Sequence, residues 1–123
     1  MNEVEEFIYQ KEAEQKELLL FLHNLLVSEF HLLAKIRFKI PFYYKNNWVI
    51  YLNPLKNNNI DFCVLRANEQ ETPHELLNFK SRKQVASIEL DPKMDLKLEI
   101  IKSIIQDALE IDKKPYHKVS SKK

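Results

Sequence analysis

The sequence predicts an α+β domain in which an antiparallel sheet of four to five strands carries N-terminal helices and a C-terminal helix packed on it. Apolar residues recur at helical spacing near both ends of the chain. Between residues 34 and 66 they alternate with polar residues, as in half-buried strands. The gaps between these alternating runs are short, which predicts antiparallel pairing because parallel strands need long crossover connections.

Two helices are expected before residue 30. Asn2 followed by Glu5 is typical of a capping box and predicts a helix near 3–9. A second helix, or a continuation of the first, is expected near 12–29. Its apolar stripe is wide, which indicates burial against more than one neighbour. The stripe is formed by Leu18, Phe21, Leu22, Leu25 and Leu26.

Alternation predicts the first two strands. In 34–40 the apolar side chains alternate with Lys35, Arg37 and Lys39, which indicates a half-buried strand with a basic outer face. Pro41 is expected to end or bend this strand, with 42–44 continuing as extended chain. A hairpin turn at 45–47 then leads to a strand at 48–52. There Trp48, Ile50 and Leu52 are expected on one face, and Val49 and Tyr51 on the other.

Two more strands and a helix complete the domain. Residues 60–66 alternate again, 67–81 are irregular with a helical turn expected after Thr72-Pro73, and 84–90 is the last strand. Asp91-Pro92 is expected to open the C-terminal helix as a cap followed by proline. Pro115 is expected to stop it. The helix face is formed by Leu96, Ile100, Ile101, Ile104, Ile105 and Ala108.

The chain contains no glycine. Glycine is the residue that adopts positive φ without strain and lets a backbone approach a phosphate closely. Its absence excludes a Walker A loop, a G-x-G-x-x-G turn and a G-x-S-x-G nucleophile elbow. Asparagines between the apolar runs are expected to take glycine's usual positions, because Asn tolerates the left-handed region best among the rest. They are Asn46, Asn47, Asn57, Asn58, Asn59 and Asn68.

Length and charge fit one small domain. We expect a single domain over 1–112, followed by a basic, frayed tail at 113–123. The net charge is +1, but residues 1–30 hold seven acids against two lysines. The rest of the chain is therefore basic, and the two regions offer surfaces of opposite charge. Near-zero overall charge disfavours nucleic acid as a partner.

Cysteine content and the N-terminus predict a cytoplasmic protein. Cys63 is the single cysteine, so no intrachain disulfide can form. The acidic N-terminus does not have the basic start of a signal peptide, and the longest apolar run, 18–22, is too short to cross a bilayer. Within its alternating strand, Cys63 is expected to be a buried, inert thiol.

A basic and aromatic cluster is the leading candidate site. Such a mixture can bind an anionic ligand by stacking and charge, although the same residues also suit a protected strand face with aromatics in the core. For a ligand-binding role, Tyr43, Tyr44 and Trp48 would supply the stacking surface, and Lys80, Arg82 and Lys83 the charge. The wider cluster also includes Lys35, Arg37, Lys39, Tyr51 and Arg66.

Metal binding is a weaker candidate. The four histidines show no i, i+4 pair, and His23, in an apolar helix, is expected to be a satisfied core residue. A hard cation needs several converging carboxylates. The acids of the first helices are instead spread around them, as on a solvated face.

The order of elements and several short motifs resemble a known family. Ile40-Pro41-Phe42 closes the first strand, an aromatic hairpin follows at 43–52, and 77–85 leads into the last strand before a long helix. Over roughly residues 2–112 this is similar to the bacterial YdhG-like domain family, a domain of unknown function. Family members often have glycines before the last strand, where this chain has Ser81-Arg82-Lys83.

The resemblance implies a second function, because some YdhG-like proteins are described as frataxin-like intracellular iron chaperones for iron–sulfur assembly. Its implied carboxylate ligands would be Glu5, Glu6, Glu12 and Glu14. Three functions are therefore expected. The first is a small binding or accessory domain, without enzymatic activity or cofactor, for an anionic ligand or protein partner. The second is an iron chaperone. The third is a structural or dimerising module that uses Val49, Tyr51 and Leu65, so the chain would be a monomer or a homodimer.

Overall fold

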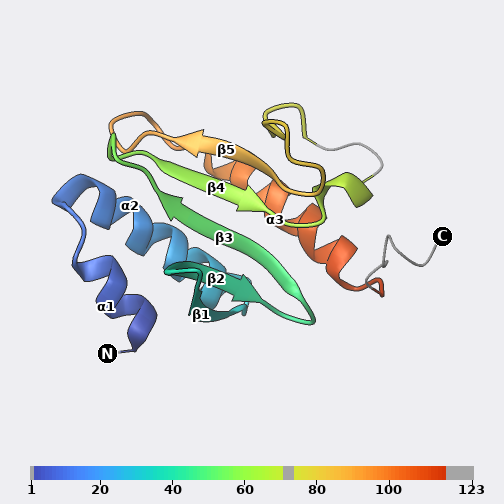
Figure 1. Ribbon diagram of the computed structural model, residues 1–123, viewed down its shortest axis with the longest axis horizontal. Helices are drawn as coiled ribbons and strands as arrows, with labels where there is room; N and C mark the ends of the chain where they lie inside the picture. The colour runs from blue at the N-terminus through green and yellow to red at the C-terminus, as the bar shows by residue number, and fades with distance from the viewer. Residues whose placement is uncertain (1, 71–73, 116–123) are drawn as a thin grey trace.

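A computed structural model describes residues 2–70 and 74–115 of this chain and confirms the α+β architecture. Five antiparallel strands follow one another in the sheet in the order β1-β2-β3-β4-β5. Figure 1 shows α2 and α3 behind this sheet. The elements are α1 (Glu3–Tyr9), α2 (Ala13–Asn24), a π-helical turn (Leu25–Glu29), β1 (Leu33–Arg37), β2 (Ile40–Tyr44), β3 (Trp48–Pro54), β4 (Ile60–Val64), a 3₁₀ turn (Ala67–Glu69), β5 (Ala86–Leu90) and α3 (Leu98–Asp112).

The N-terminal helices form as the capping pattern predicts. The backbone N–H of Glu5 donates to the Asn2 side chain at 2.8 Å, and Glu5 accepts from the Asn2 N–H at 3.2 Å, which completes the capping box. The predicted helix at 12–29 is α2 together with the π-helical turn. Glu3 accepts the N–H of Ile36 at 3.2 Å, so α1 also satisfies an outward donor of the edge strand β1.

The sheet has one face against the helices and one open face. Ile50, Leu52 and Phe62 are fully buried on the helix side, where they belong to one core with residues of α1, α2 and α3. This core is the main source of stability, since each fully buried large apolar side chain contributes about 1.5–3 kcal/mol. The other face, here called the open face, carries a row of residues in register across all five strands. The row is Lys35, Phe42, Tyr51, Cys63 and Ser87.

The single predicted strand at 34–40 is wrong, because the chain turns back at Phe38 and Lys39. Both residues have positive φ, 49° and 69°, and they connect β1 to β2 as a two-residue hairpin. The alternating pattern runs on through the turn, so periodicity hides it. Phe38 is 77% exposed as a result. Pro41 lies within β2 opposite Ile36, next to the turn-closing pair, where antiparallel residues exchange no hydrogen bonds.

A β-bulge changes which side chains of β3 share a face, so the faces differ from the predicted ones. Tyr43 pairs with Ile50, but Tyr44 pairs with Trp48, so the register shifts and Val49 is the extra residue. Val49 is buried in the core cluster. Trp48 lies instead beside Phe42 on the open face, at 5.7 Å between ring centroids. The expected placement of Trp48 with Ile50 and Leu52 is therefore wrong, and so is that of Val49 on the other face with Tyr51, where it was expected to form a dimerising surface.

The C-terminal helix begins later than predicted. Asp91 accepts the Lys93 N–H through its side chain at 2.9 Å, and its carbonyl accepts the Met94 N–H at 3.0 Å. This closes a single turn rather than a helix, and α3 begins at Leu98 and ends at Asp112, before Pro115. Its buried face agrees with the predicted one at Ile101, Ile104, Ile105 and Ala108. The last strand begins at Ala86 rather than at residue 84.

Two further expectations concern the segment before β5 and the tail. Thr72 and Pro73 lie outside the described residues, and after them a single turn is closed by the Leu77 N–H and the His74 carbonyl at 2.9 Å. Residues 116–123 of the predicted tail also lie outside the described part. Within the described residues, none of the helices combines the length and the apolar character that a bilayer crossing requires.

The positive φ values fall mostly on residues other than asparagine. Of the predicted asparagines, only Asn58 adopts one, at 72°. The other positive-φ residues of the described chain are His31, Phe38, Lys39, Arg66, Lys80 and Ser81. Because the chain has no glycine, tertiary contacts must hold the backbone of these residues in the left-handed region. This region costs a non-glycine residue about 1 kcal/mol or more.

This strain gives a stability prediction. Lys39→Gly is expected to raise the free energy of unfolding by about 0.5 kcal/mol, because relief of the Cβ clash exceeds the added entropy of the unfolded chain. Urea unfolding measures it. Lys35→Gly, in the middle of β1 with ordinary strand geometry, is the matched control and is expected to destabilise. Equal destabilisation by both variants would contradict a strained turn.

Candidate functional site

Aromatic side chains gather on the open face around Trp48. Phe42 stacks on Tyr51 with 4.7 Å between ring centroids, and Tyr44 meets Trp48 edge to face at 4.9 Å. The Arg37 guanidinium lies 4.8 Å from the centroid of the Trp48 ring, within cation–π range. β2 and β3 place these side chains together, and the bulge turns Trp48 toward them.

Trp48 lines a pocket at one end of the open face. Its volume is about 450 Å³, and its walls come from the β2–β3 hairpin, the end of β4 and the segment before β5. Among the described residues, the lining includes Arg66 and no acidic residue, with three amide-bearing residues alongside two aromatic ones. This Trp48 pocket is lined by Tyr44, Asn46, Asn47, Trp48, Leu65, Arg66, Gln84 and Val85.

Asp112, at the end of α3, holds the hairpin that forms one wall. Its carboxylate accepts the backbone N–H groups of Asn46 at 2.9 Å and Asn47 at 2.8 Å, and the Asn47 side-chain amide at 3.2 Å. Asp112 is 4% exposed, so these hydrogen bonds satisfy a buried charge. The predicted turn at 45–47 is therefore fixed by a residue far away in the sequence.

Arg66, another residue of the pocket lining, is fixed in a similar way. It is 4% exposed and makes a two-pronged ion pair with Glu69, at 2.7 and 2.8 Å. One of its nitrogens also donates to the carbonyls of Lys114 and Pro115, at 3.3 and 3.2 Å. Arg66 thus ties the end of β4 to the chain that follows α3.

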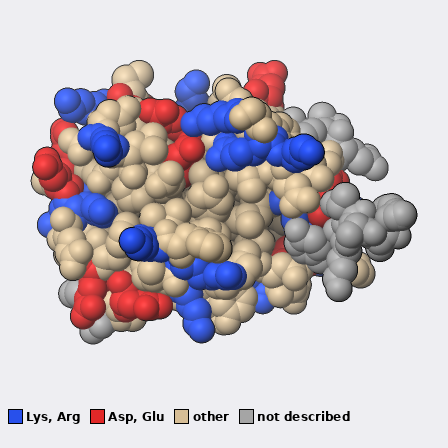
Figure 2. Space-filling view, viewed as in Figure 1, with Lys and Arg blue, Asp and Glu red and all other residues tan. Residues whose placement is uncertain are grey.

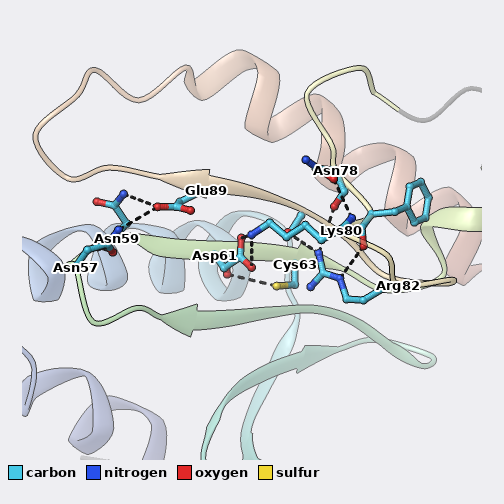
Figure 3. A network of polar contacts seen from close by, with 10 residues as sticks. Asn57, Asn59, Asp61, Cys63, Asn78, Lys80, Arg82 and Glu89 are labelled. Carbon is cyan, nitrogen blue, oxygen red and sulfur yellow. Dashed lines mark hydrogen bonds and ion pairs between the residues drawn. The ribbon is translucent and has the colours of Figure 1, made fainter.

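A second polar group lies on the open face across β4 and β5 (Figure 3). Lys80 reaches Asp61 at 3.3 Å, and Arg82 bonds the Ser87 hydroxyl at 2.7 Å and the Phe79 carbonyl at 3.0 Å. Lys80 and Ser81 both have positive φ, so a tight turn points these bases back over the sheet. Their charges are used largely within the domain.

The thiol and the phenol beneath this group are protonated at neutral pH. Burial, with a smaller contribution from the Asp61 carboxylate, raises the pKa of Cys63 to about 11. Burial raises the pKa of Tyr51 to about 12, and the nearby Arg82 opposes that shift. Cys63 is fully buried, as expected for an inert thiol.

The predicted site residues separate into three groups. Tyr44 and Trp48 come together in the Trp48 pocket. Lys80 and Arg82 lie across β4 and β5, and Lys83 is exposed immediately before Gln84 of the pocket. Tyr43 is fully buried in the core, on the other side of the sheet, because successive strand residues point to opposite faces. It cannot stack a ligand, so that part of the predicted site is wrong.

Tyr43 instead pairs with His23 of α2, as expected for a satisfied core histidine. The Nδ1 atom of His23 and the Tyr43 hydroxyl are 2.8 Å apart. Burial lowers the pKa of His23 from 6.5, and the Glu5 carboxylate opposes this shift only partly.

This buried pair predicts a pH dependence of stability. Because the pKa is lower in the folded state, the unfolded chain binds the proton first. Stability is therefore fully present above pH 6.5 and falls as the pH drops below it. Urea unfolding at several pH values is expected to show a shallower acid loss in His23→Gln than in the parent. The control, His31→Asn, changes an exposed histidine and should retain the parent's slope; equal slopes in all three would contradict the assignment.

The glutamates singled out for metal binding lie on or beside the first two helices. Glu5 belongs to the capping box of α1, and Glu12 is the N-cap of α2 without a side-chain capping bond. Glu6 and Glu14 are exposed. Among residues 2–70 and 74–115, no group of three or more His, Cys, Asp or Glu is placed to hold a metal ion.

Charge is unevenly spread over the open face. Figure 2 shows Lys and Arg side chains over the β1–β2 hairpin and over the segment before β5, with uncharged surface between them. Of the open-face acids, Asp61 is bonded to Lys80, and Glu89 accepts from Asn59 at 2.6 Å and from Asn57 at 3.3 Å. The bases flank the aromatic surface that leads to the Trp48 pocket.

Comparison with known proteins found no matching family model, no matching curated protein and no matching solved structure.

Sequence reasoning missed several pocket residues. For Leu65 and Gln84, the sequence indicated only positions in predicted strands and nothing that pointed to a pocket. Arg66 appeared among the basic residues, but its burial was not expected. Asn46 and Asn47 were predicted as a turn, and the turn signal itself was the available clue to a pocket wall.

Proposed function

We propose that this chain is a small cytoplasmic binding domain that takes an anionic aromatic ligand in the Trp48 pocket. One observation supports it above the others: the described residues of the pocket lining combine two aromatic rings with Arg66, which is ion-paired to Glu69, and include no acid. On the residue resemblance alone, we also propose that the chain is a divergent YdhG-like protein. The iron-chaperone and dimerising alternatives stay predictions from the sequence.

The ligand class follows from the chemistry of the walls. Trp48, Tyr44 and Leu65 favour a flat apolar ring, since aromatic pairs gain energy beyond the area that they bury. The side chains of Asn46, Asn47 and Gln84 carry amide N–H groups suited to oxygen acceptors. Arg66 in the lining and the exposed Lys83, which precedes the lining residue Gln84 in the sequence, favour a negative charge over a positive one. Binding rather than catalysis fits a site whose described lining residues include no Ser, Thr, Cys, Lys or His.

Three ligands of one shape test the proposal. Benzoate, benzamide and benzamidine share a ring and differ in charge. Trp48 is the single tryptophan, so the intrinsic fluorescence change reports on the pocket. Benzoate is expected to bind tightest and benzamidine weakest, with benzamide between them. Equal affinities for benzoate and benzamidine, or no response to any of the three, would refute the proposal.

Two variants separate stacking from charge. Tyr44→Leu is expected to weaken both benzoate and benzamide by about fivefold, because it removes ring contact from each. Lys83→Ala is expected to weaken benzoate by about twofold and leave benzamide unchanged, as befits an exposed charge. Lys56→Ala, an exposed lysine of the β3–β4 turn, is the control and should change neither. If Tyr44→Leu affects neither ligand, the ring does not bind in this pocket.

A further inference from the structure

The helical side of the domain carries a row of neighbouring hollows, separate from the Trp48 pocket. It consists of three hollows of about 270, 380 and 420 Å³. The first lies between β5 and the start of α3, and shares Asp91, Met94 and Leu96 with the second. The second and third share Phe21 of α2. The three hollows are therefore neighbours along α2, the 91–97 segment and α3, and together they are here called the helical groove.

Exposed apolar side chains concentrate in the helical groove. The described residues include six exposed large hydrophobic side chains, and three of them line it: Phe21, Leu76 and Met94, with exposed fractions of 43%, 39% and 69%. Exposed apolar patches with a polar rim mark interaction sites on soluble proteins. Methionine adds adaptability, since its unbranched side chain can repack against different partners.

The rim of the helical groove is strongly acidic. Two lysines line it, Lys97 and Lys102, and Lys102 is already paired with Glu29 at 3.0 Å. Among the described residues, five acids with side chains on this side of the sheet line it, so its surplus is three negative charges. The surplus complements a basic partner, in contrast to the open face. The acids are Glu14, Glu17, Glu29, Asp91 and Asp95.

We propose that the helical groove binds a basic amphipathic helix of a partner protein. The apolar side of that helix would contact Phe21, Met94 and Leu96, with its lysines or arginines against the acidic rim. Amphipathic helices bind grooves in this way through anchors at i, i+3 or i+4 and i+7. A second copy of this chain fits poorly, because a twofold-symmetric contact through the groove would place the acidic rim against itself.

A pair of synthetic peptides tests the proposal on the full chain. A dye-labelled amphipathic helix of leucine and lysine is compared by fluorescence anisotropy with the same pattern built from leucine and glutamate. The lysine peptide is expected to bind, and more weakly as salt increases, while the glutamate peptide does not. Equal binding of both peptides, or no binding of the lysine peptide, would overturn the proposal.

Variants locate the binding. Phe21→Ser is expected to weaken the lysine peptide about tenfold, as loss of an apolar anchor does at an interface. Glu14→Gln with Glu17→Gln is expected to weaken it about fivefold and to reduce its salt dependence. Both changes are at exposed positions, so the fold should persist.

Matched controls lie outside the groove. Phe38→Ser removes an exposed aromatic elsewhere, and Glu6→Gln with Glu12→Gln removes two neighbouring acids; neither should change binding. If Glu6→Gln with Glu12→Gln weakens peptide binding as much as Glu14→Gln with Glu17→Gln does, the charge attraction is unspecific and the proposal is overturned. A concentration-dependent dimer that Phe21→Lys abolishes would assign the groove to a second copy instead.

Discussion

Asp112→Ala is expected to lower the free energy of unfolding by about 3 kcal/mol. The carboxylate is the partner of two backbone N–H groups, those of Asn46 and Asn47, and of the Asn47 side chain. Its removal leaves three partly buried donors without their acceptor, and a loss of this kind costs about 1–3 kcal/mol for a buried donor. The β2–β3 hairpin would then loosen, and with it a wall of the Trp48 pocket.

Urea unfolding of two related variants shows whether the hydrogen bonds carry the effect. Asp107→Ala changes an exposed aspartate on the same helix and should cost less than about 0.5 kcal/mol. Asp112→Asn keeps the shape and one carbonyl acceptor, so its cost should lie between the two. If Asp112→Ala is no worse than Asp107→Ala, the hairpin does not depend on α3 for its position.

Arg66→Ala is expected to destabilise the fold by about 3 kcal/mol, because it removes one partner of a largely buried ion pair. Glu69 would lose both of its hydrogen bonds from the guanidinium, and the carbonyls of Lys114 and Pro115 would lose their donor. Thermal or urea unfolding measures the loss. The same variant should weaken benzoate more than benzamide, since it removes the charged group of the pocket lining.

The backbone of Arg66 offers an internal control. Its φ is 56°, which alanine adopts with strain and glycine without it. Arg66→Gly should therefore be more stable than Arg66→Ala by about 1 kcal/mol, although it lacks the same side chain. A glycine variant as stable as the parent would mean that the ion pair contributes only about the 1 kcal/mol that glycine regains by relieving the backbone strain.

The regular elements were predictable because their signal is local. The capping box at Asn2 and Glu5 and the apolar stripe of α3 depend on neighbours within a turn. The hairpin turn at Phe38 and Lys39 was not, because alternation continues through a two-residue turn and neither residue favours positive φ. The late start of α3 was missed because the cap-and-proline pattern at Asp91 closes only a single turn here.

The candidate site was predictable only in part, for a related reason. Tyr44 and Trp48 were correctly placed together by the hairpin prediction. Tyr43 was included wrongly. It precedes Tyr44 in β2, and successive strand residues point to opposite faces, so Tyr43 lies in the core. The bulge at Val49 reverses the alternation of β3 locally. The hydrogen bond between Asp112 and Asn46 joins residues that are 66 positions apart in the sequence. Neither can be recognised from a local pattern.

The binding of an anionic aromatic ligand at Trp48 is tested most directly by a two-dimensional ¹H–¹⁵N NMR titration with benzoate and benzamidine. We expect benzoate to shift the Trp48 indole signal together with the amide signals of Asn46, Asn47, Gln84 and Val85, and benzamidine to shift them far less. Shifts that fall elsewhere, or that are equal for the two ligands, would contradict the proposed site.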